Sequence, residues 1–127
     1  MIDAAAPARI LIADDDPVFR EVAASCLRNS GYDVDLASEG AEAMDVLLRE
    51  AFDLAIVDLI MPRIDGLRLI ALVRATPILR ALPILVITSE EDPTIHAEGL
   101  QVGANDYLTK PVDWSELPGR VAALLDA

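Results

Sequence analysis

One stretch decides the fold of this chain: Leu54-Ala55-Ile56-Val57-Asp58-Leu59-Ile60-Met61-Pro62-Arg63-Ile64-Asp65-Gly66. Four apolar residues, 54–57, run without a break into the carboxylate of Asp58, and the turn-forming pairs Met61-Pro62 and Asp65-Gly66 follow. A short apolar run bounded by turn residues predicts a buried strand of a parallel sheet. Asp58 then lies at the carboxyl end of that strand, where open α/β sheets bind their ligands.

The composition indicates a globular domain with an acidic surface. The chain has 127 residues, of which 54% are hydrophobic, enough for one domain with its own core. Its 22 acidic and 10 basic residues leave a net charge of −12. Because nucleic-acid binding depends on Lys and Arg neutralising phosphates, we expect no direct contact with DNA or RNA. A basic protein partner, or a metal at an acidic site, suits this charge better.

Neither a membrane segment nor a secretory signal is predicted. No apolar run approaches the roughly 18 residues of a membrane helix. Residues 1–8 lack a basic region and a long apolar core. The lone Cys26 excludes an internal disulfide, which fits a reducing compartment. We expect a cytoplasmic protein in which residues 1–8 form a short tail and residues 9–126 form the domain.

Apolar runs and helical spacings alternate along the chain. Strands are predicted at residues 9–13, 32–36, 53–57, 84–87 and 106–109. Helices are predicted at residues 17–29 and 38–50, from residue 66, at residues 93–102, and from residue 113. Five strands alternating with five helices predict an α/β fold whose parallel sheet is covered on both faces.

Capping residues and prolines predict where the helices begin. The predicted N-caps are Asp16, Ser38, Asp65 and Asp113. Pro118 is unfavourable inside the last helix, because proline removes a backbone hydrogen bond and crowds the preceding turn. That helix is therefore expected either to be kinked at Pro118 or to begin there.

Polar residues gather at the ends of the predicted strands. Asp14-Asp15-Asp16 follow the first strand, Asp58 the third, Thr88-Ser89 the fourth and Lys110 the fifth. If these ends meet, the carboxylates repel one another, and a divalent cation such as Mg2+ relieves the repulsion. A helix cap with surface charge is the alternative for the aspartate triplet. The apolar strand before it and the equivalent position of Asp58 favour a metal site.

Thr88 and Lys110 add groups that bind an anion. A hydroxyl and a fixed positive charge, beside a metal and a carboxylate, form a receptor for a phosphoryl group, whose transfer demands positioning and charge neutralisation. Asp58 is then the nucleophile, because a carboxylate can form an acyl phosphate. His96 is a candidate phosphate carrier, but its helix has an exposed pattern, so we predict a surface residue without a partner.

These motifs together resemble the receiver domain of two-component response regulators, from about Arg9 to Leu125. The matching motifs are Asp14-Asp15, the Val-Asp-Leu-x-Met-Pro-x-x-Asp-Gly context of Asp58, Thr88, and Gly103 to Pro111 with Lys110-Pro111 at its end. Each motif is weak alone, but their order and spacing are specific. The resemblance implies a flavodoxin-like (βα)5 three-layer sandwich with a parallel five-stranded sheet in the order 2-1-3-4-5.

The resemblance also implies a phosphoryl-transfer site at these strand ends. Asp58 accepts the phosphoryl group from a phosphohistidine of a histidine kinase or a histidine phosphotransfer protein. Mg2+ (or Mn2+) is bound directly by Asp15, Asp58 and the backbone carbonyl of Ile60, and through water by Asp14. Lys110 pairs with the phosphoryl oxygens. Such a protein is a signalling phosphoacceptor and not an enzyme, with at most self-catalysed phosphorylation and dephosphorylation.

The remaining implied roles concern the conformational response. Thr88 moves to hydrogen-bond the phosphoryl group, and Tyr107 turns inward as it does so. Ser89 stands where a smaller Ala is common in the family, and it should still leave room for a phosphoryl group. The Lys110-Pro111 bond is implied to be cis, whereas an X-Pro bond is cis in only about 5–6% of cases. A downstream protein partner then recognises the altered surface.

Two departures from the family pattern lead to further expectations. Ile60, two residues after Asp58, is apolar and cannot orient an attacking water, so we hypothesise a long-lived phosphate on Asp58. Glu90, two residues after Thr88, is polar and could act against this. Pro118-Gly119 weakens the last helix and with it a dimer on the face of the fourth and fifth helices, so we expect a monomer or a weak dimer.

Two alternatives stay open at this point. One is a receiver fold that acts as a binding module without phosphorylation. The other is a haloacid-dehalogenase-like phosphatase with Asp14 as the nucleophile, since Asp14-Asp15-Asp16-Pro17-Val18 fits that family's Asp-x-Asp-x-Thr/Val pattern. The second alternative leaves Asp58 without a role.

Overall fold

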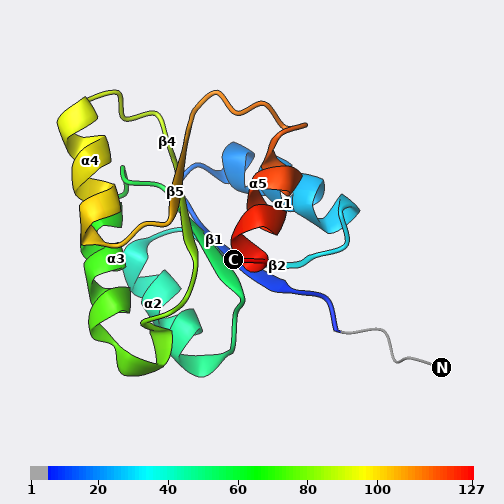
Figure 1. Cartoon of the computed structure of the whole chain (residues 1–127), viewed down its shortest axis with the longest axis horizontal. Helices are drawn as coiled ribbons and strands as arrows, with labels where there is room; N and C mark the ends of the chain where they lie inside the picture. Colours follow the sequence, from blue (N-terminus) through cyan, green and yellow to red (C-terminus); the bar gives the residue numbers. More distant parts are fainter. Residues whose placement is uncertain (1–5) are drawn as a thin grey trace.

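The computed structural model describes residues 6–127, and the predicted tail at residues 1–8 lies largely outside them (Figure 1). The strands are β1 (Arg9–Ala13), β2 (Asp33–Ala37), β3 (Leu54–Val57), β4 (Ile84–Thr88) and β5 (Asp106–Thr109). The helices are α1 (Pro17–Asn29), α2 (Gly40–Arg49), α3 (Gly66–Ala75), α4 (Pro93–Val102) and α5 (Leu117–Leu125), with a 3-10 turn, η1, at Pro77–Leu79. Within the described residues no helix is long and apolar enough to span a membrane.

The five strands form one parallel sheet in the order β2-β1-β3-β4-β5, which confirms the predicted order. In the register of the central strands, Ala13 of β1 lies opposite Val57 of β3, and Val57 lies opposite Val86 of β4. At the edge, Thr88 of β4 lies opposite Thr109 of β5. The residues that follow β1, β3, β4 and β5 therefore come together at one edge of the sheet.

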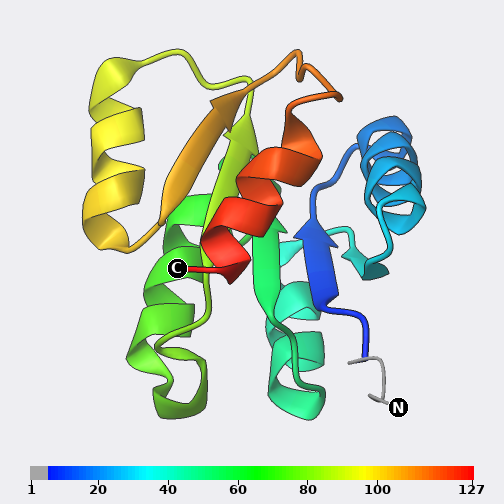
Figure 2. The ribbon, with the colours of Figure 1, turned by 45° about the vertical axis from the view of Figure 1, so that its right-hand side comes forward.

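Helices cover both faces of the sheet and make three layers (Figures 1 and 2). Successive residues of a strand point to opposite faces, so β1 contributes Leu11 and Ala13 to one core and Ile10 and Ile12 to the other. The first core packs beneath α2, α3 and α4, and the second beneath α1 and α5. The predicted three-layer α/β sandwich is confirmed.

Some predicted details of the helices are wrong. Helix α2 begins at Gly40 after Glu39, and the Ser38 side chain does not cap it. Instead the backbone N–H and the hydroxyl of Ser38 both donate to the Glu42 carboxylate, at 2.6 and 3.1 Å. Leu48 of α2 is 51% exposed.

The start of the last helix also differs from the prediction. Asp113 accepts hydrogen bonds from Ser115 and does not cap α5, which begins at Leu117. Pro118 thus falls in the first turn, where the missing N–H has no helical partner to lose. The expectation that the helix begins near Pro118 is correct. Leu117 and Val121 face the core and are fully buried.

Candidate functional site

Two aspartates occupy equivalent places at the ends of the central strands. The backbone N–H of Asp14, after β1, donates to the Ala37 carbonyl, and that of Asp58, after β3, donates to the Ala13 carbonyl, at 3.1 and 3.0 Å. These hydrogen bonds continue the sheet by one residue at each strand. The backbone of both aspartates is therefore fixed by the sheet itself.

The carboxylates of Asp14, Asp15 and Asp58 form a cluster in which ligand oxygens lie within 4.8 Å of one another. Asp14 is 1% and Asp58 4% exposed, whereas Asp15 is exposed to solvent. Asp16, the third acid of the triplet, turns away and caps α1 through the Val18 N–H at 2.9 Å. The helix-cap interpretation thus holds for Asp16 but not for its two neighbours.

Lys110 brings a positive charge to this cluster. Its Nζ donates to Oδ2 of Asp14 at 2.7 Å and to Oδ2 of Asp58 at 3.0 Å. The other oxygens accept from backbone: Oδ1 of Asp14 from the Asp16 N–H at 2.8 Å, and Oδ1 of Asp58 from the Ile60 N–H at 3.0 Å. Each buried carboxylate is thereby held in one orientation.

The electrostatics of the cluster leave an excess of negative charge. Burial raises the pKa of the Asp14 carboxyl, although the hydrogen bond from Lys110 opposes this shift. Burial alone lowers the pKa of Lys110, but its hydrogen bonds to Asp14 and Asp58 outweigh burial and the net pKa is raised. One ammonium faces three carboxylates, so the donor set fits a hard divalent cation with oxygen ligands.

Phe19 is a contact of Lys110 that the sequence analysis missed. The Nζ atom lies 4.1 Å from the centroid of the Phe19 ring, a cation–π geometry. The Phe19 ring in turn packs against Trp114, with centroids 5.5 Å apart. In the sequence, Phe19 is an inward-facing apolar residue of α1, and no pattern pairs it with a lysine 91 positions later.

Thr88 and Ser89 differ in their surroundings. Thr88 is fully buried, and its Oγ1 accepts from the Glu90 N–H at 3.2 Å. Its carbonyl accepts from the Lys110 N–H at 2.9 Å, which places the end of β5 beside it. Ser89 is exposed at the mouth of the site.

Tyr107 and His96 form a second small cluster beside the first. The Tyr107 hydroxyl donates to the Glu90 carbonyl at 3.3 Å, and His96 Nε2 contacts the same oxygen. The two rings pack with centroids 4.0 Å apart. Burial, and then the negative charges of Glu90 and Asp58, raise the pKa of Tyr107 to about 12. The prediction of a partnerless surface residue at His96 is wrong.

The loop after Asp58 is shaped by a close backbone contact. A Cβ on Gly66 would lie 2.3 Å from the Asp58 carbonyl oxygen and 2.6 Å from Cα of Leu59, so only glycine fits. Asp65 caps α3 as predicted, accepting from the Arg68 N–H at 2.9 Å. The Ile60 side chain is 50% exposed. The Lys110–Pro111 bond across the site is cis.

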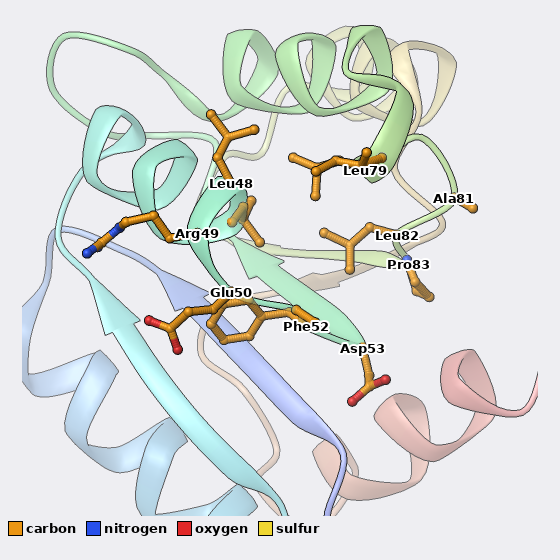
Figure 3. Close-up of a pocket in the computed structure, with 12 residues that line it drawn as sticks. Leu48, Arg49, Glu50, Phe52, Asp53, Leu79, Ala81, Leu82 and Pro83 are labelled. Atoms are coloured by element: carbon orange, nitrogen blue, oxygen red, sulfur yellow. The ribbon is translucent and has the colours of Figure 1, made fainter.

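A separate pocket of about 580 Å³ lies at the opposite end of the sheet (Figure 3). It is lined by the end of α2, the segment before β3, and residues around η1 and before β4. Two of the lining residues contact Arg9, which pairs with Glu50 at 2.7 Å and lies 4.5 Å over the Phe52 ring. The lining includes neither Asp58 nor Lys110, so this pocket is not part of the carboxylate site.

The arrangement at the carboxylate site permits a defined chemistry. A fixed carboxylate with its partner ammonium stands at the mouth of a site able to bind a cation. A carboxylate so placed can attack an electrophile, and the cation and ammonium neutralise charge that develops on the electrophile's oxygens.

Comparisons with known proteins find similarity to one family over most of the chain. A family model described as the response regulator receiver domain matches residues 10–122. The response regulator MprA of Mycobacterium sp. (strain KMS) is 42% identical over 119 residues, 94% of this chain and 51% of that protein. MprA of Mycobacterium leprae (strain TN) is 42% identical over 117 residues, 92% of this chain and 50% of that protein. The chain thus spans about half the length of the curated relatives it matches.

Solved structures match over most of the chain. Vibrio cholerae chemotaxis protein CheY4 superposes with a TM-score of 0.89 at 32% identity, covering 94% of this chain and 99% of that one. The receiver domain of sensor histidine kinase PA1611 from Pseudomonas aeruginosa PAO1 superposes with a TM-score of 0.89 at 31% identity, covering 96% and 100%. That structure is described as having a magnesium ion coordinated in the active site cleft.

Proposed function

The chain belongs to the family of response regulator receiver domains, and we propose that Asp58 accepts a phosphoryl group from a phosphohistidine of a histidine kinase or histidine phosphotransfer protein. The observation that carries this proposal is the shared hydrogen bonding of Lys110 Nζ to Asp14 and Asp58 beside the three-carboxylate cluster. Asp14 and Asp58 are both paired with Lys110, and Asp58 is the one that follows the central strand β3. Residues 9–126 form the domain in this proposal.

The proposed transfer is a displacement at phosphorus. A carboxylate oxygen of Asp58 forms the new P–O bond as the P–N bond breaks, and the histidine nitrogen leaves with the electron pair and takes up a proton. Lys110 moves from the Asp58 oxygen to a phosphoryl oxygen, a short shift because its Nζ already lies 3.0 Å away. Asp15, Asp58 and the Ile60 carbonyl would bind Mg2+ or Mn2+, with Asp14 acting through water. The cation supplies neutralisation of the phosphoryl charge.

The proposed output is a conformational change that a partner protein recognises. Thr88 Oγ1 accepts from the Glu90 N–H, so a move of the hydroxyl toward the phosphoryl group releases the loop that follows β4. Tyr107 is tied to the same loop through the Glu90 carbonyl and turns inward with it. Exposed Ser89 leaves room for the phosphoryl group. We assign this signalling role to a cytoplasmic protein that is a monomer or a weak dimer.

Labelling with a small phosphodonor tests the proposal. The protein is treated with phosphoramidate and Mg2+, and the modified residue is mapped by mass spectrometry, beside Asp58→Asn and the exposed control Asp45→Asn. Wild type and the control should gain one phosphoryl group on Asp58, and Asp58→Asn should gain none. Label on Asp14 would instead support a phosphatase, and no label together with no response to beryllofluoride would support a binding module.

A further inference from the structure

Helix α1 begins almost directly beyond the carboxylate site. Only Asp14, Asp15 and Asp16 connect the end of β1 to the start of α1 (Figure 2). A helical side chain leans toward the amino-terminal end of its own helix, and this direction carries Arg20 back over the first turn of α1. Its Nη1 donates to the backbone carbonyl of Asp14 at 2.7 Å. An arginine of α1 is thus bonded to the backbone of the site.

The carbonyl that Arg20 binds belongs to the peptide group between Asp14 and Asp15. On its other side, the N–H of Asp14 donates to the Ala37 carbonyl at 3.1 Å, which fixes Asp14 to the sheet. A peptide group is planar, so its carbonyl and its N–H turn together. The hydrogen bond from Arg20 therefore sets the rotation of this group, and with it the direction in which the chain continues to Asp15.

The three carboxylates of the site differ in how they are held. Those of Asp14 and Asp58 both accept from Lys110, and each also accepts from a backbone N–H. Asp15 is exposed, and among residues 6–127 no hydrogen bond holds its carboxylate. Its ligand oxygen nevertheless lies within 4.8 Å of those of the other two. The place of the Asp15 carboxylate thus depends on its backbone, which is the part that Arg20 holds.

We propose that Arg20 is a positioning residue that orients the Asp14–Asp15 peptide group and so directs the Asp15 carboxylate to the cation site. This inference rests on the proposed function, because it assigns a support to a residue that is proposed there as a metal ligand. Groups outside the ligand set orient metal ligands in many proteins, and their loss weakens metal binding.

The charge of Arg20 would act in the opposite direction. A guanidinium near the carboxylates repels a cation, so its removal by electrostatics alone would tighten cation binding. Loss of the hydrogen bond to the Asp14 carbonyl should instead weaken it. The sign of the change on removing Arg20 therefore separates positioning from electrostatics.

Binding of Mn2+ tests the inference without a phosphoryl donor. Free Mn2+ is counted by electron paramagnetic resonance in titrations of wild type, Arg20→Met and Asp15→Asn, and the last variant identifies the ion bound at the site. Arg20→Met should raise the Kd for this ion about tenfold, the lower end of what the loss of such a support costs. Arg20→Lys keeps a charged donor and should lie between wild type and Arg20→Met.

Arg28→Met is the matched control. Arg28 lies on the same helix, and its Nη2 donates to the backbone carbonyl of Val34 at 2.9 Å. The substitution removes the same charge and the same kind of hydrogen bond, but Val34 lies in β2 and not at the carboxylate site. Arg28→Met should leave the Kd for Mn2+ unchanged. A merely structural role of Arg20 would lower the thermal midpoint and give both variants the same Kd.

Labelling with phosphoramidate supplies a second measurement. The Mg2+ concentration that gives half of the maximal rate should rise in Arg20→Met, because the cation site is less well formed. The rate at saturating Mg2+ should equal that of wild type, because Asp58 and Lys110 are unchanged. A slower rate at saturation with an unchanged half-saturating concentration would contradict the inference.

The outcomes distinguish this inference from the proposed function. A Kd in Arg20→Met that equals or falls below that of Arg28→Met, while Asp15→Asn loses the ion, overturns the role of Arg20 alone. If Arg20→Met does not fold, Arg20→Lys and Arg28→Lys are compared in the same way. A wild type whose Mn2+ binding is the same as that of Asp15→Asn overturns the proposed metal site, and the inference with it.

Discussion

The ammonium of Lys110 lies 3.0 Å from Oδ2 of Asp58 and joins two strand ends that are 52 residues apart in the chain. The same nitrogen lies 2.7 Å from Oδ2 of Asp14, so a cation from the end of β5 is shared by the buried carboxylates that follow β1 and β3. The parallel sheet makes this possible, because it delivers all three strand ends to one edge. The predictions below concern this pairing and the contacts that support it.

Replacing Lys110 with Met should separate cation binding from phosphoryl transfer. Without the ammonium the carboxylates repel one another more strongly, so the affinity for Mg2+ should rise. Phosphorylation by phosphoramidate should slow on the order of a hundredfold, because a charge that stabilises the transferring group is lost. Trp114 fluorescence measures the affinity for Mg2+, and labelling kinetics measure the rate of phosphorylation. Unchanged labelling in this variant would remove Lys110 from the transfer step, and Arg68→Met at an exposed site is the control.

Phe19→Leu should weaken the site through Lys110. Loss of the cation–π contact is expected to cost about 0.5–2 kcal/mol and to leave the ammonium less firmly placed. Phe52→Leu is a matched control, because Phe52 faces Arg9 at 4.5 Å at the opposite end of the sheet. Urea unfolding should show both variants to be destabilised, but only Phe19→Leu should slow labelling with phosphoramidate. Equal labelling rates in the two would show that the Phe19 ring does not position Lys110.

Gly66→Ala should disrupt the loop beneath Asp58. The new Cβ would lie 2.3 Å from a backbone oxygen, and backbone cannot yield as a flexible side chain does. We expect a loss of about 1–3 kcal/mol in the free energy of unfolding, measured in urea. Gly119→Ala in α5 is the opposite case, since nothing lies within 4 Å of the added carbon. It should stabilise the protein by up to about 1 kcal/mol. Destabilisation by Gly119→Ala, or none by Gly66→Ala, contradicts this account.

The Asp106–Arg120 pair should make stability depend on acid pH. Arg120 donates to both oxygens of Asp106, at 2.8 and 3.0 Å, and holds the pKa of that carboxyl below its ordinary value of about 3.9. Because the pKa of this carboxyl is lower in the folded than in the unfolded protein, the ion pair stabilises the fold at pH values above the ordinary pKa. This stabilisation is lost as the pH falls through the pKa of the folded state. Asp106→Asn should therefore be less stable than wild type at pH 7, and the difference should shrink below about pH 4.

Urea unfolding at a series of pH values measures this difference. Asp33→Asn, at an exposed position, should show no comparable dependence. A difference between wild type and Asp106→Asn that stays constant down to pH 2 would mean that the ion pair is not its source.

Ile60→Asn should shorten the lifetime of the phosphate on Asp58. The Ile60 side chain is 50% exposed beside Asp58 and offers no polar atom to an attacking water. An amide there should raise the hydrolysis rate by about tenfold, less than the contribution of a full general base. Decay of the labelled protein, followed by mass spectrometry, measures the rate, with Ile60→Val as control. An unchanged lifetime in Ile60→Asn refutes the hypothesis.

The sequence by itself determined the strands, their order through the family pattern, and the set of residues at the strand ends. Apolar runs such as 54–57 end directly in Asp58, and a parallel sheet places such ends at one edge, so local pattern was sufficient. Asp65 as the cap of α3 followed equally from its own neighbours. Ser38 and Asp113 were predicted as caps by the same reasoning and are not, because nearby side chains, Glu42 and Ser115, bind them instead.

Only the tertiary structure decided which side chains support the site. Three contacts join segments that are far apart in the chain or folded back on one another. They are Phe19 with Lys110, His96 with Tyr107, and Gly66 with the Asp58 carbonyl. These contacts depend on how far each helix is rotated and how closely it packs on the sheet. Helical spacing shows which residues face inward, but it does not encode which atom of another segment they meet.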